Sequence, residues 1–167
     1  MRKIRIEKVT LNIGVGQPGD KLEKAMKLLK NITDRKPVQT KTMKRIPTWG
    51  LRPNLPIGCK VTLRGDLAEK ILNRLLKSRG NILPNSKFDN LGNFSFGIPE
   101  YIDIPGVDYD PDIGIIGLEV AVNLVRPGYR IKLRKIKKAK IPQRNRITME
   151  EAIGFIKEKF DTKIEEE

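Results

Sequence analysis

Short segments in which apolar and polar residues alternate constrain the fold of this chain most strongly. Residues 9–15, 59–64 and 118–124 each show the period-two pattern of a β-strand that buries one face. Strands of a parallel sheet covered on both faces have continuous apolar runs instead. The alternation therefore predicts a mostly antiparallel sheet with one polar face, on which Lys60 and Arg64 contribute positive charge.

Helical stripes lie between and after these strands. Residues 22–32 and 67–76 place apolar side chains at the spacing of an amphipathic helix, and Gly80 is placed to end the second helix. Residues 153–160 indicate a third helix near the C-terminus. Each helix is preceded by the spacing of a capping box: Asp20 with Glu23, Asp66 with Glu69, and Thr148 with Glu151.

Loops and shorter strands account for much of the remaining chain. Residues 38–42 have few apolar groups and predict a short strand that either lies near a sheet edge or faces a ligand. Residues 45–58 are rich in proline and glycine and predict a long loop, whereas residues 98–116 predict an irregular excursion. Residues 118–133 predict a hairpin that turns at Arg126-Pro127-Gly128.

Aromatic residues beside polar ones offer two interpretations. A strand beginning at Asn93 alternates two phenylalanines with Asn93 and Ser95. Core packing of the phenylalanines is favoured, which leaves the polar residues outward as hydrogen-bonding groups for RNA. Trp49 lies in the long loop between Arg45 and Arg52, where it either stacks on RNA or folds back to pin its own loop.

The charge of the chain is strongly positive and unevenly distributed. The 34 Lys and Arg residues exceed the 20 Asp and Glu residues by 14. Residues 35–64 contain eight basic residues and residues 126–146 contain ten, with no acid in either block. The six acids within residues 100–119 have no Lys or Arg among them. Separate basic blocks favour a surface that binds nucleic acid over a merely solvated surface or one that binds acidic lipid.

Composition also excludes several kinds of site. The chain has no histidine, which excludes histidine-dependent acid–base catalysis and a Ser-His-Asp triad. Cys59 is the single cysteine, so no disulfide forms within the chain, and its place on an alternating strand predicts that it faces the core. No run approaches the roughly 20 apolar residues of a membrane span. We expect a cytoplasmic protein with no membrane segment.

Two motifs match enzyme or metal sites in part. Gly14–Gly19 has the G-x-G-x-x-G spacing of a dinucleotide site, between a strand and a helix. Residues 39–44 offer no acid where one should bind the ribose, so a glycine-rich turn is favoured, whose backbone amides at a helix start would still suit one phosphate. Residues 108–119 match several ligand positions of a calcium loop, but Ile113 occupies the position that requires glycine. Neither motif predicts a cofactor or a metal.

Three segments, in order, carry a resemblance to a known family: Val9–Gly16, Pro56–Gly65 and Gly92–Gly97. They resemble the universal large-subunit ribosomal protein family that binds 5S ribosomal RNA, number five in bacterial nomenclature and number eleven in eukaryotes. The basic run to Arg146, followed by a capped helix, looks like the archaeal branch. The resemblance implies an α+β fold: a single domain with a curved, mostly antiparallel sheet, helices packed on one side, a long basic hairpin and a C-terminal helix.

The resemblance also implies where RNA binds. Residues 1–147 would form the domain that binds 5S rRNA, and residues 148–167 the C-terminal helix and acidic tail. The polar sheet face would bind 5S rRNA through Asn12, Gln39, Thr40, Lys41, Thr42, Lys44, Lys60, Thr62, Arg64, Asn93 and Ser95. The long loop would contact transfer RNA in the peptidyl site through Arg45, Trp49, Arg52 and Asn54.

The implied function is structural rather than enzymatic. A member of this family would attach 5S rRNA in the central protuberance of the cytoplasmic ribosome. Its further partners would be 23S rRNA, P-site tRNA and neighbouring ribosomal proteins of both subunits, with no small-molecule substrate and no membrane. Two rivals remain from the residues alone: a nucleotide-dependent enzyme at Gly14–Gly19, and a general basic RNA-binding or chaperone protein outside the ribosome.

Overall fold

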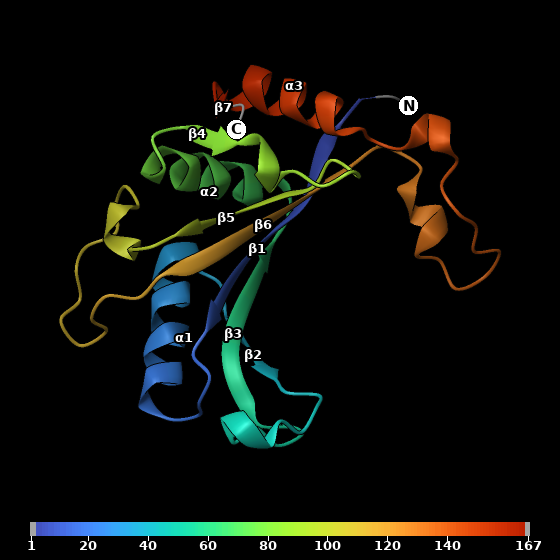
Figure 1. The fold of residues 1–167 in the computed structure, drawn as a ribbon. Coiled ribbons are helices and arrows are strands. Elements are labelled where there is room, and N and C mark those ends of the chain that lie inside the picture. The colour runs from blue at the N-terminus through green and yellow to red at the C-terminus, as the bar shows by residue number, and fades with distance from the viewer. Residues whose placement is uncertain (1–2, 166–167) are drawn as a thin grey trace. The chain divides into compact units, whose positions relative to one another are not determined.

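The computed structural model describes residues 3–165, which form three α-helices, seven β-strands and five short 3₁₀-helices (Figure 1). The helices are α1 Asp20–Thr33, α2 Gly65–Ser78 and α3 Met149–Phe160. The strands are β1 Arg5–Gly14, β2 Val38–Lys41, β3 Pro56–Leu63, β4 Ile82–Pro84, β5 Phe94–Ile98, β6 Leu118–Val125 and β7 Lys163–Glu165. The described chain divides into two compact units: unit 1 comprises residues 3–9, 63–96 and 121–165, and unit 2 comprises residues 10–62 and 97–120.

Five strands form one sheet in the order β2-β3-β1-β6-β5. The edge strand β2 pairs antiparallel with β3, with Val38 opposite Lys60 and Thr40 opposite Gly58. The alternation predicted for residues 118–124 is observed in β6, where every second residue from Leu118 is buried. An α+β fold built on an antiparallel sheet, with β2 at an edge, is therefore confirmed.

Unit 2 is closed by the apolar stripe of α1. Leu22, Ala25, Leu28, Leu29 and Ile32 are each at most 2% exposed. Burial of a large aliphatic side chain stabilises a fold by about 1.5–3 kcal/mol, so this stripe contributes more to the free energy of folding than any single polar contact in the unit. In unit 1, the stripe of α2 is buried in the same way, as the sequence predicted.

Two of the three predicted capping boxes are wrong. The helix α1 begins at Asp20, after Gly19, and α2 begins at Gly65, so Asp20 and Asp66 lie inside the first turn. Neither helix has a side-chain hydrogen bond at its N-cap. An acid in the first turn still interacts favourably with the positive end of the helix dipole, which explains the same sequence pattern without a cap.

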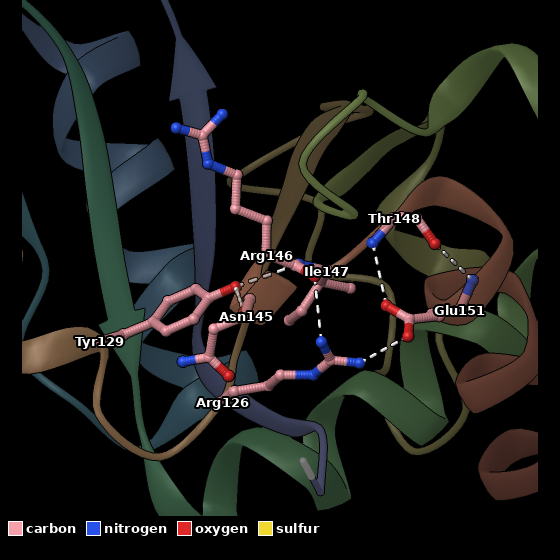
Figure 2. A network of polar contacts seen from close by, with 7 residues as sticks. All are labelled: Arg126, Tyr129, Asn145, Arg146, Ile147, Thr148 and Glu151. Carbon is pink, nitrogen blue, oxygen red and sulfur yellow. Dashed lines mark hydrogen bonds and ion pairs between the residues drawn. The ribbon is translucent and has the colours of Figure 1, made fainter. Parts of the chain in front are cut away.

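The third capping box is present at the start of α3. The Thr148 backbone N–H donates to Glu151 Oε2 at 3.1 Å, and Glu151 N–H donates to Thr148 Oγ1 at 3.4 Å. Arg126, which is 5% exposed, donates from Nη2 to Glu151 Oε1 at 2.6 Å and from Nη1 to the carbonyl of Arg146 at 3.0 Å (Figure 2). These contacts, led by the Thr148 backbone N–H, lower the pKa of Glu151.

The hairpin predicted over residues 118–133 is wrong in its second half. Residues 118–125 form β6, but Tyr129–Lys132 form a 3₁₀-helix. The Tyr129 hydroxyl donates to the carbonyl of Asn145 at 2.9 Å and accepts from Ile147 N–H at 3.1 Å. The Tyr129 side chain thus holds residues 145–147 in place. For this reason the chain after Gly128 does not need backbone hydrogen bonds to β6.

We predict that Gly58→Ala destabilises the protein by about 1–3 kcal/mol. A Cβ atom at Gly58 would lie 2.7 Å from the carbonyl oxygen of Ile13 and 2.9 Å from Thr40 Oγ1. Gly97→Ala, in the strand β5, is the matched control, since a Cβ there meets no atom within 4 Å. Urea unfolding measures both free energies, and an equal effect at the two positions would contradict the packing argument.

We predict that Glu151→Gln lowers the free energy of unfolding by about 1 kcal/mol at neutral pH, a usual loss for a capping interaction. The Glu151 side chain is 42% exposed, so solvent screens its charge and limits the loss. The folded-state pKa of Glu151 lies below the ordinary value of 4.5, so the stabilisation is complete above that pH and disappears as pH falls through the lowered pKa. Thermal unfolding from pH 7 to pH 3 should show wild type and variant converging only in acid; a constant difference would contradict it.

Candidate nucleic-acid interface

The polar face of the sheet in unit 2 presents several of the residues predicted to bind RNA. Lys60 and Thr62 are exposed on β3, where the intervening Cys59 and Val61 are buried. Thr40 lies opposite Gly58 and shares this face, as does Val38, which is 60% exposed and opposite Lys60. Asn12 is half-buried on β1 between the buried Leu11 and Ile13. The alternation thus places hydroxyl and ammonium groups of β2 and β3 on one face, beside an apolar residue, Val38, that the prediction omitted.

Gln39 points toward the opposite face of the sheet. It lies opposite the buried Cys59, and its Nε2 donates to the sulfur of Met26 in α1 at 3.5 Å. The prediction that Gln39 shares the polar face with Lys60 is therefore wrong, because period-two alternation turns every second residue of β2 away. Lys41 is exposed, but the register shifts between Thr40 and Lys41, so alternation alone does not assign its side.

Thr42 stabilises the long loop instead of facing a ligand. It is 9% exposed, and its hydroxyl donates to the carbonyl of Arg52. Its backbone N–H donates to Leu55 O at 2.9 Å, and its carbonyl accepts from Asn54 N–H at 2.9 Å. These bonds close the base of the loop over residues 43–54. The Thr42 hydroxyl already donates within the protein, so it cannot donate to RNA as predicted.

The loop presents an exposed aromatic residue among cations. Pro47–Trp49 form a 3₁₀-helix, and Ile46 pairs with Leu51 across the loop. Trp49 is 72% exposed, so it does not fold back to pin its own loop, and Met43 is 94% exposed. The other residues of the predicted tRNA-contact loop are exposed: Arg45, Arg52 and Asn54. Lys44, which was predicted to bind 5S rRNA, is exposed as well.

The three predicted residues of unit 1 differ in availability. Ser95 is exposed on β5, while Phe94 and Phe96 are buried, as predicted. Asn93 is half-buried: its Oδ1 accepts from Asn123 Nδ2 at 3.2 Å and from Leu124 N–H at 3.3 Å, and its Nδ2 donates to Asp89 Oδ2 at 2.9 Å. Asn93 therefore mainly ties neighbouring segments together. The Arg64 side chain is 61% exposed and contacts Glu7 at 3.8 Å.

The acidic excursion of unit 2 is held in place on α1. Lys27 Nζ donates to Asp110 Oδ2 at 2.8 Å, which raises the pKa of Lys27 and lowers the pKa of Asp110. The fully buried Tyr101 accepts the Asp110 N–H at its hydroxyl at 3.0 Å. Tyr109 and Ile115 remain 53% and 65% exposed. The excursion is thus a fixed acidic surface that includes exposed apolar groups.

Neither partial motif forms a site of its kind. In the turn that starts at Gly14, the backbone N–H groups of Val15 and Gly16 both donate to the carbonyl of Ile57, so they are not free to hold a phosphate. The antiparallel pairing of the sheet also differs from the parallel sheet of a dinucleotide-binding fold. Within residues 3–165, no three Asp, Glu or Cys side chains are grouped as metal ligands, and no helix has the length and apolar character needed to cross a membrane.

Cys59 is buried, although the next residue of the strand, Lys60, is exposed. The thiol is fully buried, which raises its pKa to about 11 and keeps it protonated at neutral pH. The prediction that this cysteine faces the core is confirmed, and its side chain offers no nucleophile to solvent.

Comparisons with known proteins agree with the resemblance noted in the sequence. The family model described as ribosomal protein L5 matches residues 1–52, and the model described as the C-terminus of the same ribosomal family matches residues 56–155. The chain is 54% identical to the large ribosomal subunit protein uL5 of Nanoarchaeum equitans over 165 residues, covering 98% of this chain and 97% of the relative. The uL5 of Sulfurisphaera tokodaii is 52% identical over 167 residues, covering 99% and 94%, and that of Methanosphaera stadtmanae is 50% identical over 165 residues, covering 99% and 98%. The chain therefore belongs to the ribosomal protein L5 family, whose members are structural rather than catalytic.

Proposed function

We propose that this protein is a structural component of the large subunit of the cytoplasmic ribosome, where it binds 5S rRNA and helps attach it in the central protuberance. The observation that carries this proposal is the polar sheet face of unit 2, where Lys60, Thr62 and Thr40 stand on the side opposite the buried Cys59 and Val61. This face combines one cation with two hydroxyl groups on rigid strands.

The geometry suits RNA because phosphates and 2′-hydroxyl groups require different partners. Ammonium groups such as that of Lys60 neutralise phosphates and give affinity, while hydroxyl and amide groups contact sugars and base edges. A sheet fixes the spacing of these groups before binding, so little conformational entropy is lost on docking. Contacts to 23S rRNA would extend the same chemistry to other basic parts of the chain.

The loop over residues 43–54 is proposed to contact transfer RNA in the peptidyl site. Its exposed Trp49 offers an aromatic surface for stacking, and the exposed Arg45 and Arg52 offer charge for phosphates. Thr42 fixes the base of the loop, which limits the entropy lost on contact.

The acidic excursion is proposed as the contact with a protein of the small subunit. An acidic surface repels rRNA, whereas it attracts the basic segments that are common in RNA-binding proteins. Tyr109 and Ile115, both more than half exposed, would supply the apolar part of such an interface.

We predict that Lys41→Ala with Lys60→Ala weakens binding of 5S rRNA. The slope of log affinity against log salt concentration should become shallower by up to about 1.5. The matched control is Lys21→Ala with Lys30→Ala, which removes the same charge from exposed positions of α1. A filter-binding titration across salt concentrations, with an unrelated structured RNA of equal length beside 5S rRNA, measures the effect. Equal losses for both variants, or equal affinity of the wild type for both RNAs, would leave only non-specific charge as the cause of binding.

We predict that Trp49→Ala with Arg52→Ala spares the affinity for 5S rRNA but changes the chemical probing of P-site tRNA on reconstituted ribosomes. The physical reason is that Trp49 and Arg52 are exposed in the loop between β2 and β3 and belong to neither strand, so their removal leaves the polar sheet face intact. Trp49→Phe with Arg52→Lys, which keeps an aromatic ring and a charge, should restore the wild-type probing pattern. Loss of 5S affinity with unchanged tRNA probing would refute this role of the loop.

A further inference from the structure

A hollow on unit 1, hereafter the Tyr129 pocket, is formed by the basic segment that follows β6. Its volume is about 340 Å³. Leu91, Leu124, Ile141 and Ile147 provide apolar atoms, whereas three cations belong to its lining. The complete lining is Leu91, Asn93, Leu124, Tyr129, Lys132, Lys140, Ile141, Arg146 and Ile147.

The floor of this pocket is fixed before any ligand arrives. The Tyr129 hydroxyl is held by the carbonyl of Asn145 and the N–H of Ile147, and the adjacent Arg146 carbonyl is held by the buried Arg126 (Figure 2). Gly92 packs closely against Ile147: a Cβ there would lie 2.6 Å from Ile147 Cγ2. The apolar wall therefore does not need to rearrange to receive a ligand.

Three cations belong to the lining of this pocket: Lys132, Lys140 and Arg146. Lys132 Nζ lies 5.5 Å from the centroid of the Tyr129 ring, so an aromatic face holds this cation beside the pocket. The Arg146 side chain points away from the hydrogen-bonded network in Figure 2, and Lys140 is exposed. No carboxylate is among the described residues that line the pocket.

Two neighbouring hollows of unit 1 differ in charge. One is lined by Glu69, Glu151 and Glu158, in addition to cations. The other shares Tyr129 and Lys132 with the Tyr129 pocket but also contains Glu7, Asp66 and Glu69. Carboxylates in the wall repel a phosphate, so the Tyr129 pocket is the hollow of these three that suits an anion.

We propose that the Tyr129 pocket binds one unpaired nucleotide of ribosomal RNA, with its base against the apolar floor and its phosphate among Lys132, Lys140 and Arg146. This inference rests on the proposed ribosomal function. It adds a second RNA site, on unit 1, which is formed by other residues than the polar sheet face of unit 2. A base is flat and mostly apolar on its faces, which matches a hollow with four aliphatic side chains and an aromatic ring.

A nucleotide fits this pocket better than an acidic peptide does. A carboxylate would be satisfied by the cations alone and would leave Leu91, which is 55% exposed, in contact with water. A nucleotide uses both parts of the lining. The exposed segment 132–140 carries further cations that can follow the phosphates on either side of the bound nucleotide. These are Arg134, Lys135, Lys137 and Lys138.

The test is the affinity for a single-stranded oligouridylate of roughly five residues, measured by fluorescence anisotropy beside an abasic phosphodiester of equal length and charge. The wild type should bind the oligouridylate at least about fivefold more tightly than the abasic chain. Leu91→Ser should remove most of this preference and leave binding of the abasic chain unchanged. Lys132→Gln with Lys140→Gln should weaken binding of both probes.

The matched control is Lys135→Gln with Lys138→Gln, which removes the same charge from the same exposed segment but outside the pocket lining. This control should weaken binding less than the Lys132 and Lys140 pair does. Equal losses for the two pairs, or equal affinity of the wild type for the two probes, would overturn the proposal. Tighter, Leu91-dependent binding of a polyglutamate peptide would also overturn it, in favour of a protein partner.

The outcome can be separated from that of the sheet-face proposal. Lys41→Ala with Lys60→Ala should lose affinity for 5S rRNA and keep the Leu91-dependent preference for the oligouridylate, because the two sets of residues belong to different units. Circular dichroism of each variant establishes that it is folded, and Leu91, Lys132 and Lys140 are all exposed, so their replacement spares the core.

Discussion

A sheet that buries one face and leaves the other polar is the constraint on which the remaining structure depends. The buried residues of β3, such as Cys59 and Val61, alternate with Lys60 and Thr62, so each strand contributes to the core and to the surface at once. A chain with 14 more cations than acids needs such a division, because a cation in the core without a partner costs several kcal/mol. The buried Arg126 satisfies this requirement through Glu151 and the carbonyl of Arg146.

The three helices and most strands could be predicted from local patterns, but the short parallel pair of β4 and β7 could not, and errors arose where contacts between distant residues decide the structure. Alternation was sufficient for β6, and the apolar stripe was sufficient for α2. The second arm of the predicted hairpin failed because the Tyr129 hydroxyl bonds to residues 16 and 18 positions further along the chain. Sequence spacing between Asp20 and Glu23 could not distinguish a capping box from two acids inside the first turn.

The same limit applies to the candidate interface. Lys60 and Thr62 were assigned to the polar face by alternation, and they are exposed there. Gln39 was assigned to the wrong face of the sheet: it is exposed, but it lies opposite the buried Cys59, and its Nε2 donates to the sulfur of Met26. The uses of Thr42 in closing a loop and of Asn93 in bonding to Asn123 depend on tertiary contacts that no local pattern encodes. The Tyr129 pocket likewise depends on contacts between segments that are distant in the sequence.

The exposure of Trp49 has a practical consequence for work on this protein in solution. It is the single tryptophan of the chain, and 72% of it is accessible to water, so the indole emission of the protein arises from one residue in one loop. A polar solvent shell shifts indole emission to longer wavelengths, and contact with a stacked base quenches it. The native chain therefore carries a built-in optical reporter of that loop, which requires no attached dye and no second tryptophan to be subtracted.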